Sequence, residues 1–258
     1  LPIEGVLAPL CRALEENTGA VLVAEPGAGK TTVVPLALLE ALWRGDGRIL
    51  MLEPRRLTAR AAAARMARLL GEEVGETVGL RVRMETRVSR RTRIEIVTEG
   101  VFTRMILDDP ELSGIACVIF DEFHERSLDG DLGLALALDT QGALREDLKI
   151  LPMSATLDAA AVARLLGDVP VITCPGRTFP VETHYLGRDP RKPAADQVAS
   201  AVRKALSQES GSVLAFLPGQ GEIRRAADLL EGTLPRDTDL APLYGALDPK
   251  AQAAAIRP

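Results

Sequence analysis

The feature that most constrains this chain is a glycine-rich turn between an apolar stretch and a helix-like segment. The turn reads Glu-Pro-Gly-Ala-Gly-Lys-Thr-Thr over residues 25–32 and is flanked by the apolar runs Ala20–Val23 and Val33–Trp43. Glycines let successive backbone N–H groups converge on one anion, and the helix that follows adds its positive N-terminal end. The arrangement predicts a nucleotide-phosphate site formed by Gly27, Ala28, Gly29, Lys30, Thr31 and Thr32.

Two residues of this turn have separate expected roles. Lys30 would reach the β- and γ-phosphates, and the Thr31 hydroxyl would bind Mg²⁺. The motif's first glycine is replaced by Ala24, but the turn itself needs only Gly27 and Gly29, and both are present. The alternative is a Gly-Lys-Thr sequence in an ordinary surface turn, which the flanking strand and helix patterns disfavour.

A second apolar stretch ends in two acids. Ile115–Phe120 has the composition of a buried strand and is followed directly by Asp121 and Glu122. Paired carboxylates at the tip of a buried strand are costly unless they have a task. We expect Asp121 to hold Mg²⁺ through a water, and Glu122 to orient and deprotonate the attacking water. The alternative is two solvated acids at the start of a loop, which the phosphate-binding turn makes the weaker interpretation.

Strand-like apolar runs alternate with helical stretches along the first 175 residues. Nearly continuous apolar strands alternating with helices predict an α/β fold with a parallel sheet covered on both faces. Ligands of such sheets bind beyond the carboxyl ends of the strands, so Gly27, Thr98, Asp121 and Ser154 are expected at one site. The predicted strands are Ala20–Ala24, Arg48–Leu52, Arg93–Thr98, Ala116–Phe120, Leu148–Met153 and Val171–Cys174.

The residues after Cys174 divide the chain. Pro, Gly and Thr in the stretch 174–180 are typical of a connector. A second α/β pattern follows, with predicted strands Val181–Leu186 and Ser212–Leu217 and predicted helices near Asp196–Glu209 and Glu222–Leu230. About 80 residues are few for a second doubly wound domain, so we expect a truncated one. The expected organisation is a first domain at 1–175, a linker at 176–182 and part of a second domain at 183–258.

The bulk composition limits the class of protein. The formal net charge of −5 argues against a generally basic nucleic-acid protein, but residues 44–104 hold fourteen arginines against eight acids. The three cysteines show no paired spacing and the two histidines are too few for a typical metal cluster, which favours a reducing cytoplasm. No apolar run approaches membrane-spanning length, and we expect no membrane partner.

The stretch Asp-Glu-Phe-His-Glu-Arg-Ser at 121–127 resembles the signature of the DEAH-box helicases of superfamily 2, with Phe123 where most members have Ala. The sequence of this stretch is most similar to the bacterial HrpB branch of that family. The stretches Phe-Leu-Pro-Gly at 216–219 and Leu-Pro-Ile at 1–3 share this similarity. Other blocks match in the family's order over essentially the whole chain: Glu53–Arg56, Thr98–Gly100, Ser154–Thr156, Phe216–Gly219 with Glu222-Ile223, and Leu243–Leu247.

The resemblance implies a RecA-like P-loop NTPase domain followed by part of a second one. It implies an ATP-dependent helicase that uses ATP and Mg²⁺ and moves along single-stranded RNA or DNA, with catalysis by Lys30, Asp121 and Glu122. His124, Ser154 and Thr156 would couple the nucleotide site to movement between domains. The residues that would contact the nucleic-acid backbone are Pro54, Arg55, Arg56, Thr98, Glu99 and Gly100. Contacts to the backbone read no base sequence, as translocation requires.

Other interpretations stay open. Ser-Ala-Thr is also typical of a turn with a capping hydroxyl, His124 could be a structural histidine, and the arginines between Arg81 and Arg93 could form a solvated face. The whole chain could serve a nucleotide-dependent switch or scaffold with vestigial ATPase activity, whereas a P-loop kinase has no use for the two acids. The chain ends before the family's two later blocks, so we expect it to bind nucleotide, hydrolyse it slowly and unwind nothing.

Overall fold

The computed structural model describes residues 1–155, 158–176 and 180–255. Its contacts divide the chain into two compact units, Leu1–Phe179 and Pro180–Pro258, which are described separately below. The predicted boundaries of the first domain, linker and second domain are not tested by this division and stay a prediction.

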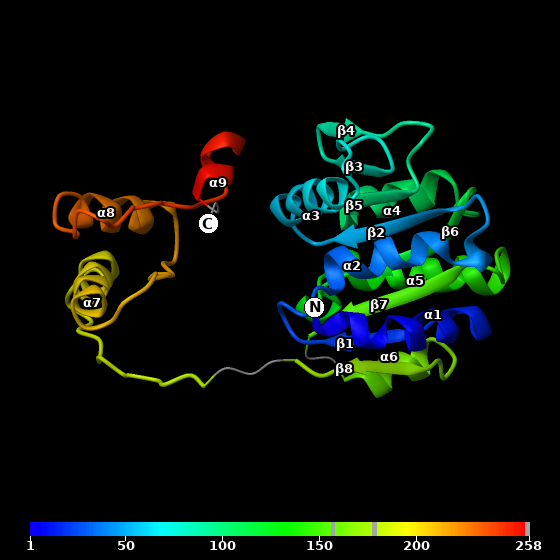
Figure 1. Ribbon diagram of the computed structural model, residues 1–258, viewed down its shortest axis with the longest axis horizontal. Helices are drawn as coiled ribbons and strands as arrows, with labels where there is room; N and C mark the ends of the chain where they lie inside the picture. Colours follow the sequence, from blue (N-terminus) through cyan, green and yellow to red (C-terminus); the bar gives the residue numbers. More distant parts are fainter. Residues whose placement is uncertain (156–157, 177–179, 256–258) are drawn as a thin grey trace. The chain divides into compact units, whose positions relative to one another are not determined.

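The first unit is built on one eight-stranded sheet (Figure 1). The strand order is β4-β3-β5-β2-β6-β7-β1-β8, and every neighbouring pair is parallel except β3 and β4. All six strands predicted in this unit are present, which confirms the α/β fold. The strands are β1 (Val21–Ala24), β2 (Arg48–Glu53), β3 (Val78–Val82), β4 (Glu85–Arg87), β5 (Ile94–Thr98), β6 (Ile115–Phe120), β7 (Lys149–Ser154) and β8 (Val171–Cys174).

Helices cover both faces of this sheet. Alternate strand residues enter two separate cores: Ile49 and Met51 of β2 pack with residues of α1, α2 and α3, whereas Leu50 and Leu52 pack with residues of α4, α5 and α6. Both faces are therefore apolar, as predicted for a parallel sheet. The elements of these layers are η1 (Pro2–Val6), α1 (Leu7–Glu16), α2 (Lys30–Ala37), η2 (Leu38–Glu40), η3 (Leu42–Arg44), α3 (Arg56–Leu69), α4 (Glu99–Asp108), η4 (Phe123–Glu125), α5 (Leu128–Ala143) and α6 (Ala159–Leu165).

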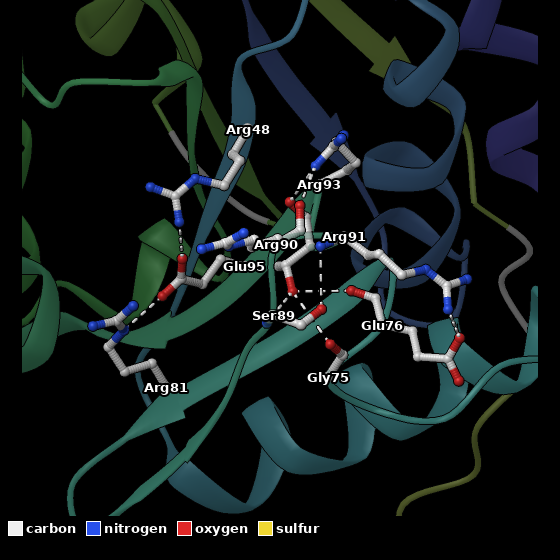
Figure 2. A network of polar contacts seen from close by, with 10 residues as sticks. Arg48, Gly75, Glu76, Arg81, Ser89, Arg90, Arg91, Arg93 and Glu95 are labelled. Atoms are coloured by element: carbon white, nitrogen blue, oxygen red, sulfur yellow. Dashed lines mark hydrogen bonds and ion pairs between the residues drawn. The ribbon is translucent and has the colours of Figure 1, made fainter.

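An ion-paired network lines the β3–β5 side of the sheet (Figure 2). Glu95 on β5 is fully buried, and its two carboxyl oxygens accept hydrogen bonds from Arg48 at 2.7 Å and Arg81 at 2.6 Å. Arg91 forms an ion pair with Glu76 at 2.9 Å. Arg91 is exposed and Arg81 is half-exposed, so the prediction of a solvated face is confirmed for Arg91, while both side chains also pair with acids. Each neutralises an acid that lies close to it only after the strands have paired.

The last strand of the first unit runs beside the first. Residues 171–174 of β8 pair with residues 21–24 of β1, with Ala24 opposite Cys174. Two residues later the backbone of Gly176 lies against the Glu25 side chain so closely that a Cβ at Gly176 would overlap the Glu25 carboxylate. The chain therefore leaves this sheet in contact with the first residue of the phosphate-binding turn.

The short helix α6 depends on a side-chain cap. Asp158 is its N-cap residue, and the Ala161 N–H donates to the Asp158 Oδ1 at 3.1 Å. Asp158→Ala is expected to destabilise the first unit by about 0.5–1 kcal/mol, because the Ala161 N–H loses its side-chain acceptor and keeps only the Asp158 carbonyl at 3.1 Å. Urea unfolding measures this loss, and Asp158→Asn, which keeps an acceptor oxygen, is the matched control. Equal stability of the Ala and Asn variants would contradict the prediction.

The second unit contains three helices within its described residues: α7 (Ala194–Gln208), α8 (Gln220–Leu230) and α9 (Pro249–Ala255). The predicted strands Val181–Leu186 and Ser212–Leu217 are wrong, because neither segment is a strand. Both segments lack strand partners for their backbone groups, and large apolar side chains on them, such as Tyr185 and Phe216, are exposed. No helix among the described residues of either unit is long and apolar enough to cross a membrane.

Candidate nucleotide site and its link to a nucleic-acid edge

The predicted site residues follow strands that end at the same edge of the sheet. The strands β1, β2, β5, β6 and β7 form an all-parallel array in which each pairs with its neighbours (Figure 1). Carboxyl ends of parallel strands meet at one edge, where ligands of open α/β sheets bind. The structure therefore brings the turn after β1, Thr98, Asp121 and Ser154 to this edge, as expected.

The phosphate-binding turn has the backbone conformation that its glycines permit. Gly27 and Gly29 have φ angles of 78° and 99°, in the left-handed region that residues with a Cβ rarely adopt. Gly29 is the N-cap residue of α2, and this helix begins at Lys30. The Ala28 side chain is buried, and the Ala28 carbonyl accepts the Ile3 N–H at 3.2 Å, which fixes the turn against η1. The turn thus directs the start of α2 towards the site.

The turn and the two acids are in direct contact. The Lys30 Nζ donates to the Glu122 Oε1 at 2.7 Å, and Lys30 is 4% exposed. The Thr31 hydroxyl donates to the Asp121 Oδ2. Pairs of residues about ninety positions apart in the sequence therefore meet, which is the geometry that a shared nucleotide and metal require.

Asp121 is buried, and charged and hydrogen-bonding side chains surround its carboxylate. Burial raises the pKa of Asp121 above its usual range, and the Thr31 hydrogen bond and the Lys30 charge oppose that shift. The Asp121 N–H donates to the Leu52 carbonyl at 3.0 Å, which sets Asp121 beside the end of β2. The neighbouring residue on β2 is Glu53, which is fully buried.

The pKa of Glu53 is also strongly shifted by its surroundings. Burial raises the pKa of Glu53 to about 9, and the adjacent Asp121 charge adds to the shift. Within the described part of the chain, no hydrogen bond of standard geometry reaches either Glu53 carboxyl oxygen, although Asp121 lies next to it. Because it is protonated at neutral pH, Glu53 adds no negative charge to the buried Asp121.

The oxygen atoms at this edge fit a magnesium ion bound together with a nucleotide. Mg²⁺ in nucleotide sites is held by one or two protein oxygens together with substrate phosphates and waters. The Thr31 hydroxyl and the Asp121 carboxylate supply such hard oxygen donors side by side. Among the described residues, no three His, Cys, Asp or Glu side chains form a metal-binding group. Thr31 and Asp121 are thus the residues that would hold the ion with the help of nucleotide phosphates.

The predicted coupling residues lie next to the two acids at the end of β6. The His124 Nδ1 is 3.4 Å from the Glu122 Oε2 and accepts the Ala155 N–H at 3.5 Å. Ser154 ends β7 and is fully buried. His124 therefore connects Glu122 to the Ser-Ala-Thr turn, whereas Thr156 lies outside the described residues.

The residues predicted to contact nucleic acid occupy the same edge. Arg55 is the N-cap residue of α3, and Thr98 is the N-cap residue of α4. Their helix N-termini present backbone N–H groups at the sheet edge, where a phosphate can accept them. Pro54 and Glu99 are half-buried, and Arg56 and Gly100 are exposed. Their role in binding nucleic acid stays a prediction.

Three polar residues of this region had no role assigned from the sequence. Glu53 follows an apolar run directly, as Asp121 does, and this shared pattern was the available signal. Glu125 forms an ion pair with Arg55 at 2.8 Å, and the Ser127 hydroxyl donates to the Glu99 Oε2 at 2.6 Å. Nothing in the sequence near Glu125 or Ser127 indicates these partners, which lie 70 and 28 residues away.

Comparison with known proteins agrees with this geometry. The family model described as "DEAD/DEAH box helicase" matches residues 8–165. The chain is 52% identical over its whole length to the ATP-dependent RNA helicase HrpB of Escherichia coli (strain K12). It is 32% identical to the ATP-dependent RNA helicase HrpA homolog of Haemophilus influenzae (strain ATCC 51907 / DSM 11121 / KW20 / Rd), again over its whole length. The predicted resemblance is confirmed.

Solved structures share the fold. The crystal structure of Escherichia coli DEAH/RHA helicase HrpB superposes with a TM-score of 0.93 at 51% identity, covering 100% of this chain and 33% of that one. A crystal structure of the E. coli DExH-box NTPase HrpB gives a TM-score of 0.82 at 51% identity, covering 100% of this chain and 32% of that one. The RecA-like helicase fold is therefore confirmed. The chain spans 32% of the E. coli relative and 20% of the H. influenzae relative.

Proposed function

Because this chain belongs to the DEAD/DEAH box helicase family, we propose that it forms the ATP-binding part of an ATP-dependent RNA helicase of the DEAH type. We propose residues 1–175 as the first RecA-like domain, 176–182 as a linker and 183–258 as the beginning of a second such domain. The observation that carries the proposal is the contact of the phosphate-binding turn with the two acids, Lys30 with Glu122 and Thr31 with Asp121.

The proposed reaction is transfer of the γ-phosphoryl group of ATP to water, and the protein contributes mainly positioning and charge. Lys30 leaves its ion pair with Glu122 to contact the phosphates, and this frees the Glu122 carboxylate to orient the attacking water and accept its proton. Thr31 and Asp121 would hold Mg²⁺, which neutralises phosphate charge when it is bound. Each hydrolysis would reset the nucleotide site for another step along the strand.

The residues at the carboxyl ends of β2 and β5 support a nucleic-acid partner. Arg55 and Arg56, with the helix N-termini that begin at Arg56 and Glu99, offer positive charge and N–H donors to phosphates. The names of both relatives specify RNA, and this supports single-stranded RNA over DNA as the substrate. The three cysteines are free thiols, which supports a reducing, cytoplasmic location.

The test is the rate of ATP hydrolysis by the complete protein with and without single-stranded nucleic acid. We expect single-stranded RNA of any sequence to raise the rate, because contacts to the backbone are sequence-independent. The stimulation should weaken as salt is raised. A nucleotide-dependent switch with vestigial hydrolysis predicts instead no response to RNA or DNA, and that outcome would overturn the motor proposal.

A further inference from the structure

Six consecutive residues contact both the nucleotide site and the predicted nucleic-acid edge. We call residues 122–127, which lie between β6 and α5, the bridging segment. At its start Glu122 binds Lys30 at 2.7 Å. Towards its end Glu125 binds Arg55 at 2.8 Å, and Ser127 binds Glu99 at 2.6 Å. A few covalently linked residues therefore connect the two sites.

The backbone of the bridging segment is held in an unfavourable conformation. Glu122 and Arg126 have φ angles of 49° and 47°, in the left-handed region that costs residues with a Cβ about 1 kcal/mol or more each. Between them lies the single turn η4, in which Phe123 is buried and packs edge-on against Phe120. Contacts of the segment with its surroundings must hold these two residues in place. Loss of one of these contacts would therefore favour a different backbone conformation at Glu122 and Arg126.

The contact between Glu125 and Arg55 occupies a group that RNA needs. The Arg55 side chain is 69% exposed and stands at the start of α3, where an incoming phosphate would meet it. Glu125 accepts one of its N–H groups and neutralises its charge. A phosphate and the Glu125 carboxylate are both anions that compete for the same guanidinium.

We propose that the Arg55–Glu125 ion pair is a latch that the phosphate backbone of RNA opens. With the latch closed, Glu125 holds the bridging segment in the conformation in which Glu122 pairs with Lys30, so that ATP must break this pair without help from RNA. An RNA phosphate that takes Arg55 releases Glu125, and the segment then relaxes and moves Glu122 away from Lys30. Glu125 is thus a positioning residue through which RNA stimulates hydrolysis. This inference rests on the proposed function.

Two charge-removing variants of the complete protein test the latch because they differ in one result. Glu125→Gln and Arg55→Gln both open it, so both should raise ATP hydrolysis in the absence of RNA by about two- to fivefold, the range for a largely exposed ion pair. Their affinities for single-stranded RNA should move in opposite directions. Glu125→Gln should bind RNA about two- to fivefold more tightly because its Arg55 is unopposed, whereas Arg55→Gln should bind more weakly. A Glu125 with a merely structural role would not tighten RNA binding.

Asp147→Asn is the matched control, because it removes the acid of another partly exposed ion pair, with Arg145 at 2.7 Å, before β7 and away from this edge. It should change neither the RNA-free rate nor RNA affinity. If wild-type hydrolysis responds to RNA but Glu125→Gln shows unchanged or weaker RNA binding, or an unchanged RNA-free rate, the latch is refuted and the helicase proposal stands. If RNA does not change the rate of ATP hydrolysis by the wild type, both the latch and the helicase proposal are refuted.

Discussion

Glu122→Gln is expected to lower the rate of ATP hydrolysis in the complete protein by about 10²- to 10⁴-fold, the contribution typical of a general base. The amide keeps the shape of the side chain but accepts no proton from the attacking water. Nucleotide binding should persist, because Lys30, Thr31 and the glycine turn are unchanged. Removal of the Glu122 charge also releases Lys30 from its ion pair, so ATP affinity should be equal or higher.

Single-turnover hydrolysis measures the chemical step in this variant, and equilibrium binding of a fluorescent ATP analogue measures affinity. Glu146→Gln, the same exchange at an exposed position before β7, serves as the control and should hydrolyse ATP at the wild-type rate. Wild-type turnover by Glu122→Gln would remove Glu122 from the water-activating role. Loss of nucleotide binding would mean that Glu122 is needed to shape the site rather than to accept a proton.

Glu53→Gln is expected to stabilise the first unit at neutral and alkaline pH. The pKa of Glu53 is raised from 4.5 to about 9 in the folded protein, so between these values the folded state holds a proton that the unfolded state has lost. Stability linked to such a group is complete below pH 4.5 and is lost as pH rises towards 9. The wild type should therefore lose about 1.4 kcal/mol relative to the variant for each pH unit between 5 and 8.

Urea unfolding of wild type and Glu53→Gln at pH 5, 6, 7 and 8 measures this difference. Glutamine has the size of a protonated glutamate, so the two proteins should be nearly equally stable at pH 5. A stability difference that stays constant across this range would show that Glu53 does not take up a proton on folding. Decreasing stability of the variant relative to the wild type with rising pH would reverse the sign and contradict the burial argument directly.

The nucleotide half of the site could be predicted from the sequence because its determinants are local. A glycine turn after one strand and two acids after another each have a recognisable pattern, and parallel pairing brings strand ends together. This is why the turn with Lys30 and the acids Asp121 and Glu122 were expected at one site, and in the structure Lys30 and Glu122, 92 positions apart, are in contact. The α/β class followed from the same alternation of apolar strands and helices.

The wrong and missed predictions concern strands and ion pairs whose partner residues come together only when the chain folds. Val181–Leu186 and Ser212–Leu217 have strand composition, but a strand also needs neighbours for its backbone hydrogen bonds, and composition does not provide them. The β3–β4 hairpin was missed because its charged sequence lacks a long apolar run. The pairing of Arg81 with Glu95 and of Arg55 with Glu125 depends on strand order, which no local pattern encodes.

The position of β8 beside β1 has a mechanical consequence. Because β8 is the last strand of the first unit, the polypeptide that continues to residue 180 starts alongside Ala24 and passes Glu25 at Gly176. We therefore expect a nucleotide that displaces the turn to press Glu25 against the Gly176 backbone, since there is no room between them even for a Cβ. The end of β8 would then respond to nucleotide binding through one direct contact, without transmission through the other strands of the sheet.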